Sequence, residues 1–328
     1  MMNNRLAKKA NGLFLIVVLL SILANIFVSL LDVKGISLHI VLNLLISQMI
    51  IVVPGLIFYL SISKDGSPFK MYKRISSLSV FLLLIFTWLI MPLVTAANVF
   101  SQIFTRNEVM SISGAVLDLP VIPMVLIMGI IGPFCEEFVF RGIINNCLLR
   151  QSGRFIASGV VSGLFFGLMH MNLNQFCYAF ILGIIFAIIN DALDSTWPSF
   201  ICHAIVNTQN VLLLFIADRI MKKASGSSLF DAYNSMAGNN DVATHAGNIA
   251  FIIMFVGLMV IALITTSLAG LLFYGICAIE GKEERFKNIF GKKEKNEDTK
   301  VLYPMGIAAI SFCIFVMFLL EPIINLMK

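Results

Sequence analysis

Long apolar runs separated by short polar segments dominate this chain. A membrane-spanning helix requires roughly 17–25 mostly apolar residues. Nine runs come close to that length or exceed it: 12–31, 38–62, 77–100, 121–149, 155–171, 176–193, 197–217, 248–278 and 303–327. The runs at 155–171 and 176–193 are short and are joined by a tight connection. The pattern therefore predicts an all-α fold, a polytopic bundle of about eight or nine transmembrane helices.

The polar segments divide the chain into four parts. We expect N-terminal transmembrane helices in 1–120, a core in 121–217, a polar loop in 218–247, and C-terminal transmembrane helices in 248–328 around a charged loop at 280–300. The 218–247 segment is rich in Ser, Gly, Asn and Asp, which favours an exposed loop. Basic residues precede the first apolar run, as in a signal peptide. Its length and the lack of a small-residue cleavage site favour an uncleaved anchor.

Composition and charge support a multi-pass integral membrane protein. Hydrophobic residues make up 59% of the 328 positions and charged residues only 12%, against about 25% charged residues in soluble domains. Sixteen lysines and arginines fall in segments on the side of the N-terminus and six on the other side. The positive-inside rule then predicts a cytoplasmic N-terminus. No phosphate-binding glycine loop or nucleic-acid motif is present, so we expect the bilayer and no nucleic acid as a partner.

Three ionisable side chains interrupt the run 121–149. Each charge near the centre of a membrane costs roughly 2.5–3.5 kcal/mol, so such residues usually face a partner or a wet cavity. Glu137 and Arg141 are four residues apart and should pair on one helix face. Glu136 is rotated by about 100° and is left as a free carboxylate suited to general-base chemistry. Gly132-Pro133 predicts a break in the helix just before both glutamates.

Two later runs carry similar pairs of polar and aromatic residues. Phe166 and His170 are four residues apart at the end of one run, and His203 and Asn207 are four apart in another. The imidazole and the amide of the second pair suit an oxyanion or a hydrogen-bonded water. If successive spans cross the membrane in opposite directions, His170 lies near the outer face and His203 lies nearer the inner face. A single site then requires a tilt, a re-entrant hairpin at 155–193, or a different span boundary.

The six cysteines are scattered through apolar runs without Cys-x-x-Cys spacing, which argues against a disulfide framework or a zinc knuckle. Cys135 and Cys202 flank the polar residues directly, so a thiol nucleophile stays open. It is the weaker alternative, because apolar surroundings disfavour the thiolate.

The three motifs together resemble those of the CAAX prenyl protease and bacteriocin-processing family, also called the Abi family, of intramembrane endopeptidases. The resemblance covers about 121–217 and rests on Glu-Glu-x-x-x-Arg, Phe-x-x-x-His and His-x-x-x-Asn in this order. It implies that Glu136 activates the attacking water together with His170. It also implies that His203 and Asn207 stabilise the oxyanion. The remaining motif residues would support the site: Glu137, Arg141 and Phe166.

The resemblance implies hydrolysis of a peptide bond near the end of a prenylated or other membrane-associated peptide. We expect no metal cofactor, because the commonest zinc signature, His-Glu-x-x-His, is absent. A divalent metal such as zinc stays open, with Glu136, His170 and His203 as candidate ligands. Two other functions also stay open: a non-enzymatic immunity or chaperone-like membrane protein, and a proton-coupled transporter.

Overall fold

The computed structural model describes residues 5–63, 73–239, 249–291 and 300–320. Among these residues, seven helices are long and apolar enough to cross a membrane: Leu6–Val33, Ile40–Ile62, Ser77–Ser101, Val121–Ser152, Leu173–Leu193, Trp197–Ser225 and Ile252–Ile279. Two shorter apolar helices, Phe155–Met169 and Pro304–Leu319, stand among them. The prediction of an all-α polytopic bundle is confirmed, and the described residues contain no strand.

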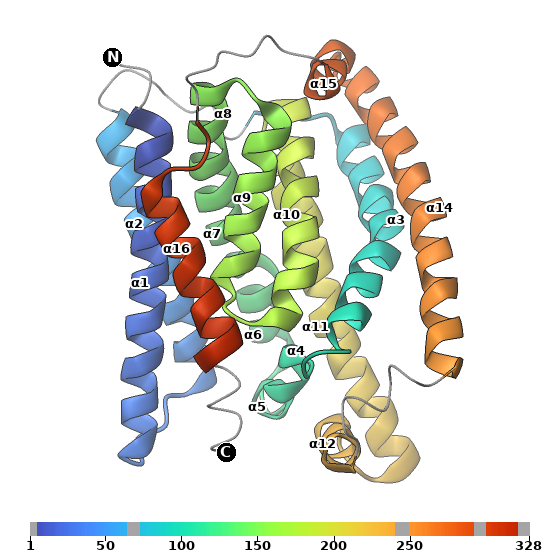
Figure 1. The fold of residues 1–328 in the computed structure, drawn as a ribbon. Helices are drawn as coiled ribbons and strands as arrows, with labels where there is room; N and C mark the ends of the chain where they lie inside the picture. Colours follow the sequence, from blue (N-terminus) through green and yellow to red (C-terminus); the bar gives the residue numbers. More distant parts are fainter. Residues whose placement is uncertain (1–4, 64–72, 240–248, 292–299, 321–328) are drawn as a thin grey trace.

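The long helices stand side by side in three groups (Figure 1). One side of the bundle holds α1 (Arg5–Val33), α2 (Ile40–Ser63) and α16 (Pro304–Phe315), which π-helical η3 (Val316–Leu320) extends. The other side holds α3 (Ser77–Ser101) and α14 (Ile249–Ile279). The centre holds α9 (Phe155–Met169), α10 (Leu173–Leu193), α11 (Trp197–Ser225) and the composite helix 121–152. Two short helices, α4 (Glu108–Ser111) and α5 (Ser113–Leu117), lie beneath this centre in Figure 1.

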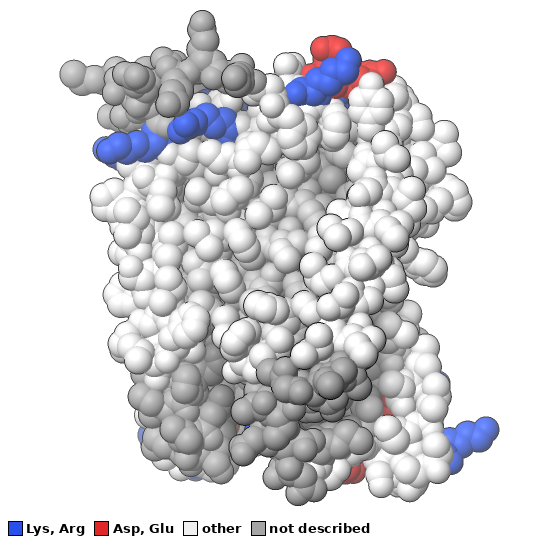
Figure 2. Space-filling view, turned by 45° about the vertical axis from the view of Figure 1, so that its right-hand side comes forward, with Lys and Arg blue, Asp and Glu red and all other residues white. Residues whose placement is uncertain are grey.

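Charged side chains are concentrated at the two ends of the bundle. On the face that Figure 2 shows, lysines and arginines lie at the ends and an uncharged belt separates them. At the end that holds the start of α1, Arg285 Nη2 lies 3.1 Å from Asp194 Oδ1, and Lys73 pairs with the same carboxylate. These contacts join the start of α3, the end of α10 and α15 (Glu283–Phe290).

The prediction of a polar loop at 218–247 is wrong over most of its length. Helix α11 continues to Ser225, and α12 occupies Leu229–Asn239. An ion pair between Asp218 and Lys222, 2.8 Å apart, supports the extra turns, and Gly226 ends the helix at φ 77°. Residues 240–247 lie outside the described part of the chain. The charged loop at 280–300 likewise contains the helix α15, and 292–299 are not described.

Helices α9 and α10 approach closely along a glycine stripe. Gly159, Gly163 and Gly167 are four residues apart and face α10. A Cβ atom added to Gly163 would lie 2.8 Å from the backbone nitrogen of Ile184, and one added to Gly183 would lie 2.7 Å from Gly163 Cα. Small residues at this spacing let two backbones pack closely in a membrane. The stripe therefore fixes the position of α9, whose end carries His170.

The composite helix 121–152 is continuous, so the predicted break at Gly132-Pro133 is wrong. It consists of α6 (Val121–Met124), π-helical η1 (Val125–Ile131), α7 (Gly132–Glu137), π-helical η2 (Phe138–Asn145) and α8 (Asn146–Ser152). Gly132 keeps helical dihedrals, φ −55° and ψ −60°, and its N–H donates to Ile127 O five residues back. The helix widens around the proline instead of breaking. The two glutamates therefore lie within a continuous helix and not at a new helix start.

Candidate active site

Glu137 is the buried centre of the site. Its Oε1 accepts hydrogen bonds from Arg141 Nη1 at 2.8 Å and from His203 Nδ1 at 2.9 Å, and the residue has no exposed surface. The predicted pairing of Glu137 with Arg141 is therefore present. Because Nδ1 donates to Glu137, only the other ring nitrogen of His203 is left to act elsewhere.

Arg141 is held by aromatic rings as well as by its carboxylate. The guanidinium carbon lies 4.1 Å from the ring centre of Phe166 and 5.3 Å from that of Phe186. Arg141 is only 1% exposed. A cation over an aromatic face is stabilised by the ring quadrupole, most strongly where water is excluded. The charge is thus kept inside the bundle by one ion pair and two rings.

Phe166 separates the two histidines and brings them into one site. Its ring centre lies 5.3 Å from that of His170 and 5.6 Å from that of His203, and both imidazoles stand nearly perpendicular to it. His170 is further fixed by a contact of 3.0 Å between Nδ1 and Phe166 O. Helix α9 has 15 residues, so it is about 22 Å long, less than the roughly 30 Å of a hydrocarbon core. The short helix leaves His170 within the bundle, which resolves the conflict in depth, and Figure 1 shows the α9–α10 turn above the lower ends of α1 and α11.

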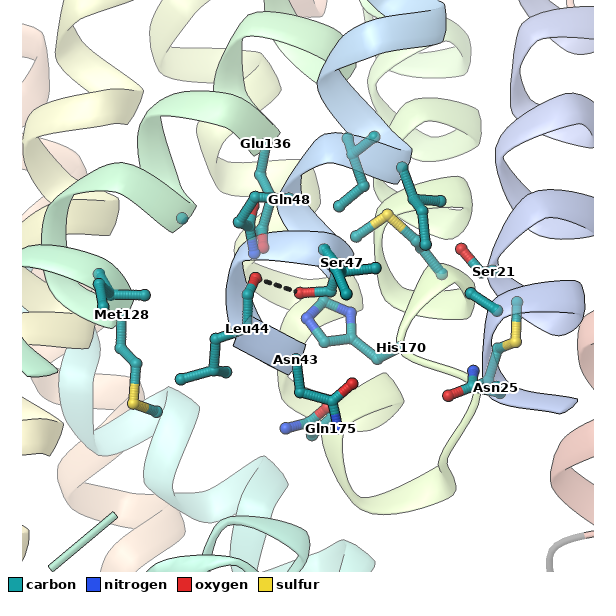
Figure 3. A pocket seen from close by; sticks show the side chains of 18 of the residues that line it. Ser21, Asn25, Asn43, Leu44, Ser47, Gln48, Met128, Glu136, His170 and Gln175 are labelled. Atoms are coloured by element: carbon teal, nitrogen blue, oxygen red, sulfur yellow. Dashed lines mark hydrogen bonds between the residues drawn. The ribbon is translucent and has the colours of Figure 1, made fainter. Parts of the chain in front are cut away.

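Glu136, His170 and Asn207 line a common cavity of about 360 Å³ (Figure 3). Its size falls within the ~300–1,000 Å³ typical of ligand pockets. Glu136 is 9% exposed, and its Oε2 lies 3.7 Å from Nε2 of His203. His203, only 4% exposed, lies behind this wall and bridges the two glutamates. The four predicted catalytic residues thus gather in one place, three on the cavity and one beneath it.

Asn207 is oriented by the irregular helix that Pro133 produces. A proline has no N–H, so it leaves one carbonyl of the preceding turn without its usual donor. Two carbonyls of that turn accept from side chains of α11: Met128 O from Asn207 Nδ2 at 3.2 Å, and Gly129 O from Thr208 Oγ1 at 3.5 Å. A Cβ atom at Gly129 would lie 2.5 Å from Thr208 Oγ1, so this approach requires glycine. The Gly132-Pro133 sequence therefore marks a place where side chains of α11 form hydrogen bonds to the composite helix.

The sequence analysis missed the wall of the cavity that α1 and α2 provide. Polar residues on these helices line it together with the catalytic candidates: Ser21, Asn25, Asn43, Ser47 and Gln48. Ser21 and Asn25 are four residues apart, as are Asn43 and Ser47, so each pair shares a helix face. This spacing inside apolar runs was the signal that could have revealed them.

The thiol and metal alternatives find little geometric support. Cys135 and Cys202 are buried, and neither is among the residues that line the cavity. A catalytic zinc site needs three converging protein ligands at about 2.0–2.3 Å. Within the described ranges, no three His, Cys, Asp or Glu side chains are arranged to hold a metal ion. Glu136 Oε2 and His203 Nε2 lie 3.7 Å apart, but no third such side chain joins them among the described residues.

Comparisons with known proteins agree with the motifs. Residues 118–209 match the family described as type II CAAX prenyl endopeptidase Rce1-like. One curated relative, "Putative membrane peptidase YdiL" of Bacillus subtilis (strain 168), is 31% identical over 101 residues. That match covers 30% of this chain and 41% of the relative, so the chain spans less than half of the relative's length. No solved structure matches the chain significantly.

Proposed function

We propose, from the premise that residues 118–209 belong to the CAAX prenyl protease and bacteriocin-processing family, that this protein is an intramembrane endopeptidase. The observation that carries the proposal is the convergence of Glu136, His170 and Asn207 on one cavity, directly above a buried Glu137–Arg141–His203 cluster. Structural packing alone does not explain a carboxylate, an imidazole and an amide around one space inside an apolar bundle.

The proposed reaction is direct attack of water on a peptide carbonyl. Glu136, aided by His170, takes a proton from the water as its oxygen bonds to the carbonyl carbon. Asn207, through its amide, stabilises the resulting oxyanion, and His203 does so through Nε2 in the protonated form, in which both ring nitrogens are donors. The carbon–nitrogen bond then breaks, and the proton held by Glu136 passes to the leaving amine. Glu137 and Arg141 act on His203 by positioning it.

We propose that this chemistry runs without a metal cofactor, because no three His, Cys, Asp or Glu side chains converge as metal ligands among the described residues. The substrate would be a membrane-associated peptide, cleaved near a chain end or in an unwound segment, since helical backbone is already hydrogen-bonded. The family suggests a peptide with a prenylated C-terminus as one such substrate.

The test is cleavage of a quenched fluorescent peptide library, which includes prenylated C-terminal peptides, by the full chain in detergent or bilayers. Glu136→Gln and His170→Ala should each lower kcat at least a hundredfold. Glu284→Gln, a matched change at an exposed residue of α15, should leave the rate unchanged. A strong chelator should also leave it unchanged. Inhibition by the chelator would overturn the metal-free mechanism, and equal rates in all variants would overturn the site.

A further inference from the structure

A polar wall from outside the family-matched segment faces the catalytic cavity. Helices α1 and α2 precede residue 118, yet Asn25, Asn43 and Gln48 line the cavity that Glu136 and His170 also line. In Figure 3 these side chains are arranged around the same space as the catalytic pair. The chemistry and this wall therefore come from different parts of the chain.

Gln48 lies close to the helix turn that precedes Glu136. A Cβ atom added to Gly132 would lie 3.6 Å from Gln48 Nε2. Gly132 precedes Glu136 by four residues, so the two share one face of the composite helix, one turn apart. The amide of Gln48 thus lies beside the helix turn next to the proposed base.

The carbonyl oxygen of Gln48 has no hydrogen-bond partner within the part of the chain that the structure describes, although it is buried. Buried polar atoms are nearly always paired, and leaving one unpaired destabilises the fold. Ser47, its neighbour on the cavity, differs in this respect because its Oγ donates to Leu44 O at 2.7 Å. An unpaired carbonyl oxygen on a residue that lines the cavity is consistent with a partner that arrives with the substrate.

We propose that Gln48 binds the backbone of an extended substrate segment in this cavity, an inference that rests on the proposed function. In an extended chain the N–H and C=O of one residue point to the same side. The side-chain amide of Gln48 offers one acceptor and two donors, so it pairs with both groups of a single substrate residue. A helical substrate offers neither group, because its backbone is bonded internally. The substrate class is therefore an unwound peptide segment, selected by its backbone.

Gln48→Leu tests this assignment in the full-length enzyme, with the best-cleaved peptide of the library as the probe. KM should rise about tenfold with kcat nearly unchanged, because the lost contact is made equally in the ground and transition states. The melting temperature should not fall, because the change removes an unpaired buried carbonyl. Gln209→Leu is the matched control. It makes the same change on α11, in a separate groove that Trp88 and Leu258 also line.

A second measurement ties the effect to the peptide backbone. In analogues of the probe, one backbone N–H at a time is replaced by N-methyl. N-methylation at one position should raise the KM of the wild type about as much as Gln48→Leu does. In the Gln48→Leu variant, the same N-methylation should raise KM little further.

The outcomes separate the two proposals. Cleavage by wild type with an unchanged KM in Gln48→Leu overturns only the role of Gln48. A lowered melting temperature, with no coupling between the variant and any N-methyl position, assigns Gln48 to structure and also overturns it. If the wild type cleaves no peptide, both the proposed function and the role of Gln48 are overturned.

Discussion

His203 and Glu137 are joined by a contact of 2.9 Å between Nδ1 and Oε1, and the same carboxylate oxygen accepts from Arg141. The histidine of the third motif is thus oriented by a carboxylate of the first, 66 residues earlier in the chain. A buried carboxylate that accepts from both a guanidinium and an imidazole fixes the orientation of the imidazole ring, as carboxylates also do for metal-bound histidines. The two motifs form one structural unit.

The Glu137–Arg141 pair should stabilise the fold only as a complete pair. Glu137→Leu alone leaves a buried, uncompensated guanidinium and should lower the free energy of unfolding by about 3–5 kcal/mol. Adding Arg141→Met removes that charge and should restore much of the stability. It should not restore kcat, because His203 still lacks its orienting partner. Thermal unfolding in detergent and initial rates measure both effects, and a double variant as unstable as the single one would contradict the pairing.

Phe166 should matter more for activity than its neighbour Phe165. Both are buried, but Phe166 contacts both histidines and Arg141, whereas Phe165 stacks on Phe14 with ring centres 4.0 Å apart. Phe→Leu at either position should cost about 1–2 kcal/mol of stability through lost packing and ring contacts. Only Phe166→Leu should also lower kcat, by about tenfold or more, because both imidazoles lose their support. Equal rates in the two variants, at equal folded fraction, would argue against this role.

Gly163→Ala should separate α9 from α10. Its new Cβ would lie 2.8 Å from the backbone nitrogen of Ile184, and backbone cannot move aside as a flexible side chain can. We expect a loss of about 1–3 kcal/mol, typical of overpacking, and a lower rate because His170 ends the displaced helix. Gly257→Ala in α14 has no atom within 4 Å of the new Cβ. It should be neutral or stabilise by up to about 1 kcal/mol. Thermal unfolding of the two variants checks the contrast.

Cysteine labelling can fix the orientation of the bundle. We expect the end that carries Arg5 and Arg154 to be cytoplasmic, because lysines and arginines concentrate there. In a Cys177→Ala background, which removes the one native cysteine that is not fully buried, Lys34→Cys should react with a membrane-impermeant maleimide on intact cells. Arg154→Cys should react only after permeabilisation. The reverse pattern would invert the bundle and move the α1–α2 turn, near which the cavity lies, to the cytoplasm.

The sequence predicted what depends on hydropathy and on helical spacing. Most predicted spans match the helices within a few residues, although α1 already begins at Arg5 and α11 continues to Ser225, and the i,i+4 rule paired Glu137 with Arg141 correctly. Prediction from the sequence failed where contacts between segments far apart in the chain decide the structure. The depth of His170 follows from the short α9 and its glycine contacts with α10. At Pro133 the helix is continuous, and side chains of α11 supply hydrogen-bond donors to its preceding turn, which no local pattern reveals.

The cavity wall that α1 and α2 provide makes the molecule modular. The groups proposed to cleave the peptide bond are encoded in one stretch of about a hundred residues, and much of what touches the occupant is encoded ahead of it. If the proposed function holds, two proteins that share the first stretch would perform the same reaction on different peptides. We then expect the choice of substrate to depend on α1 and α2.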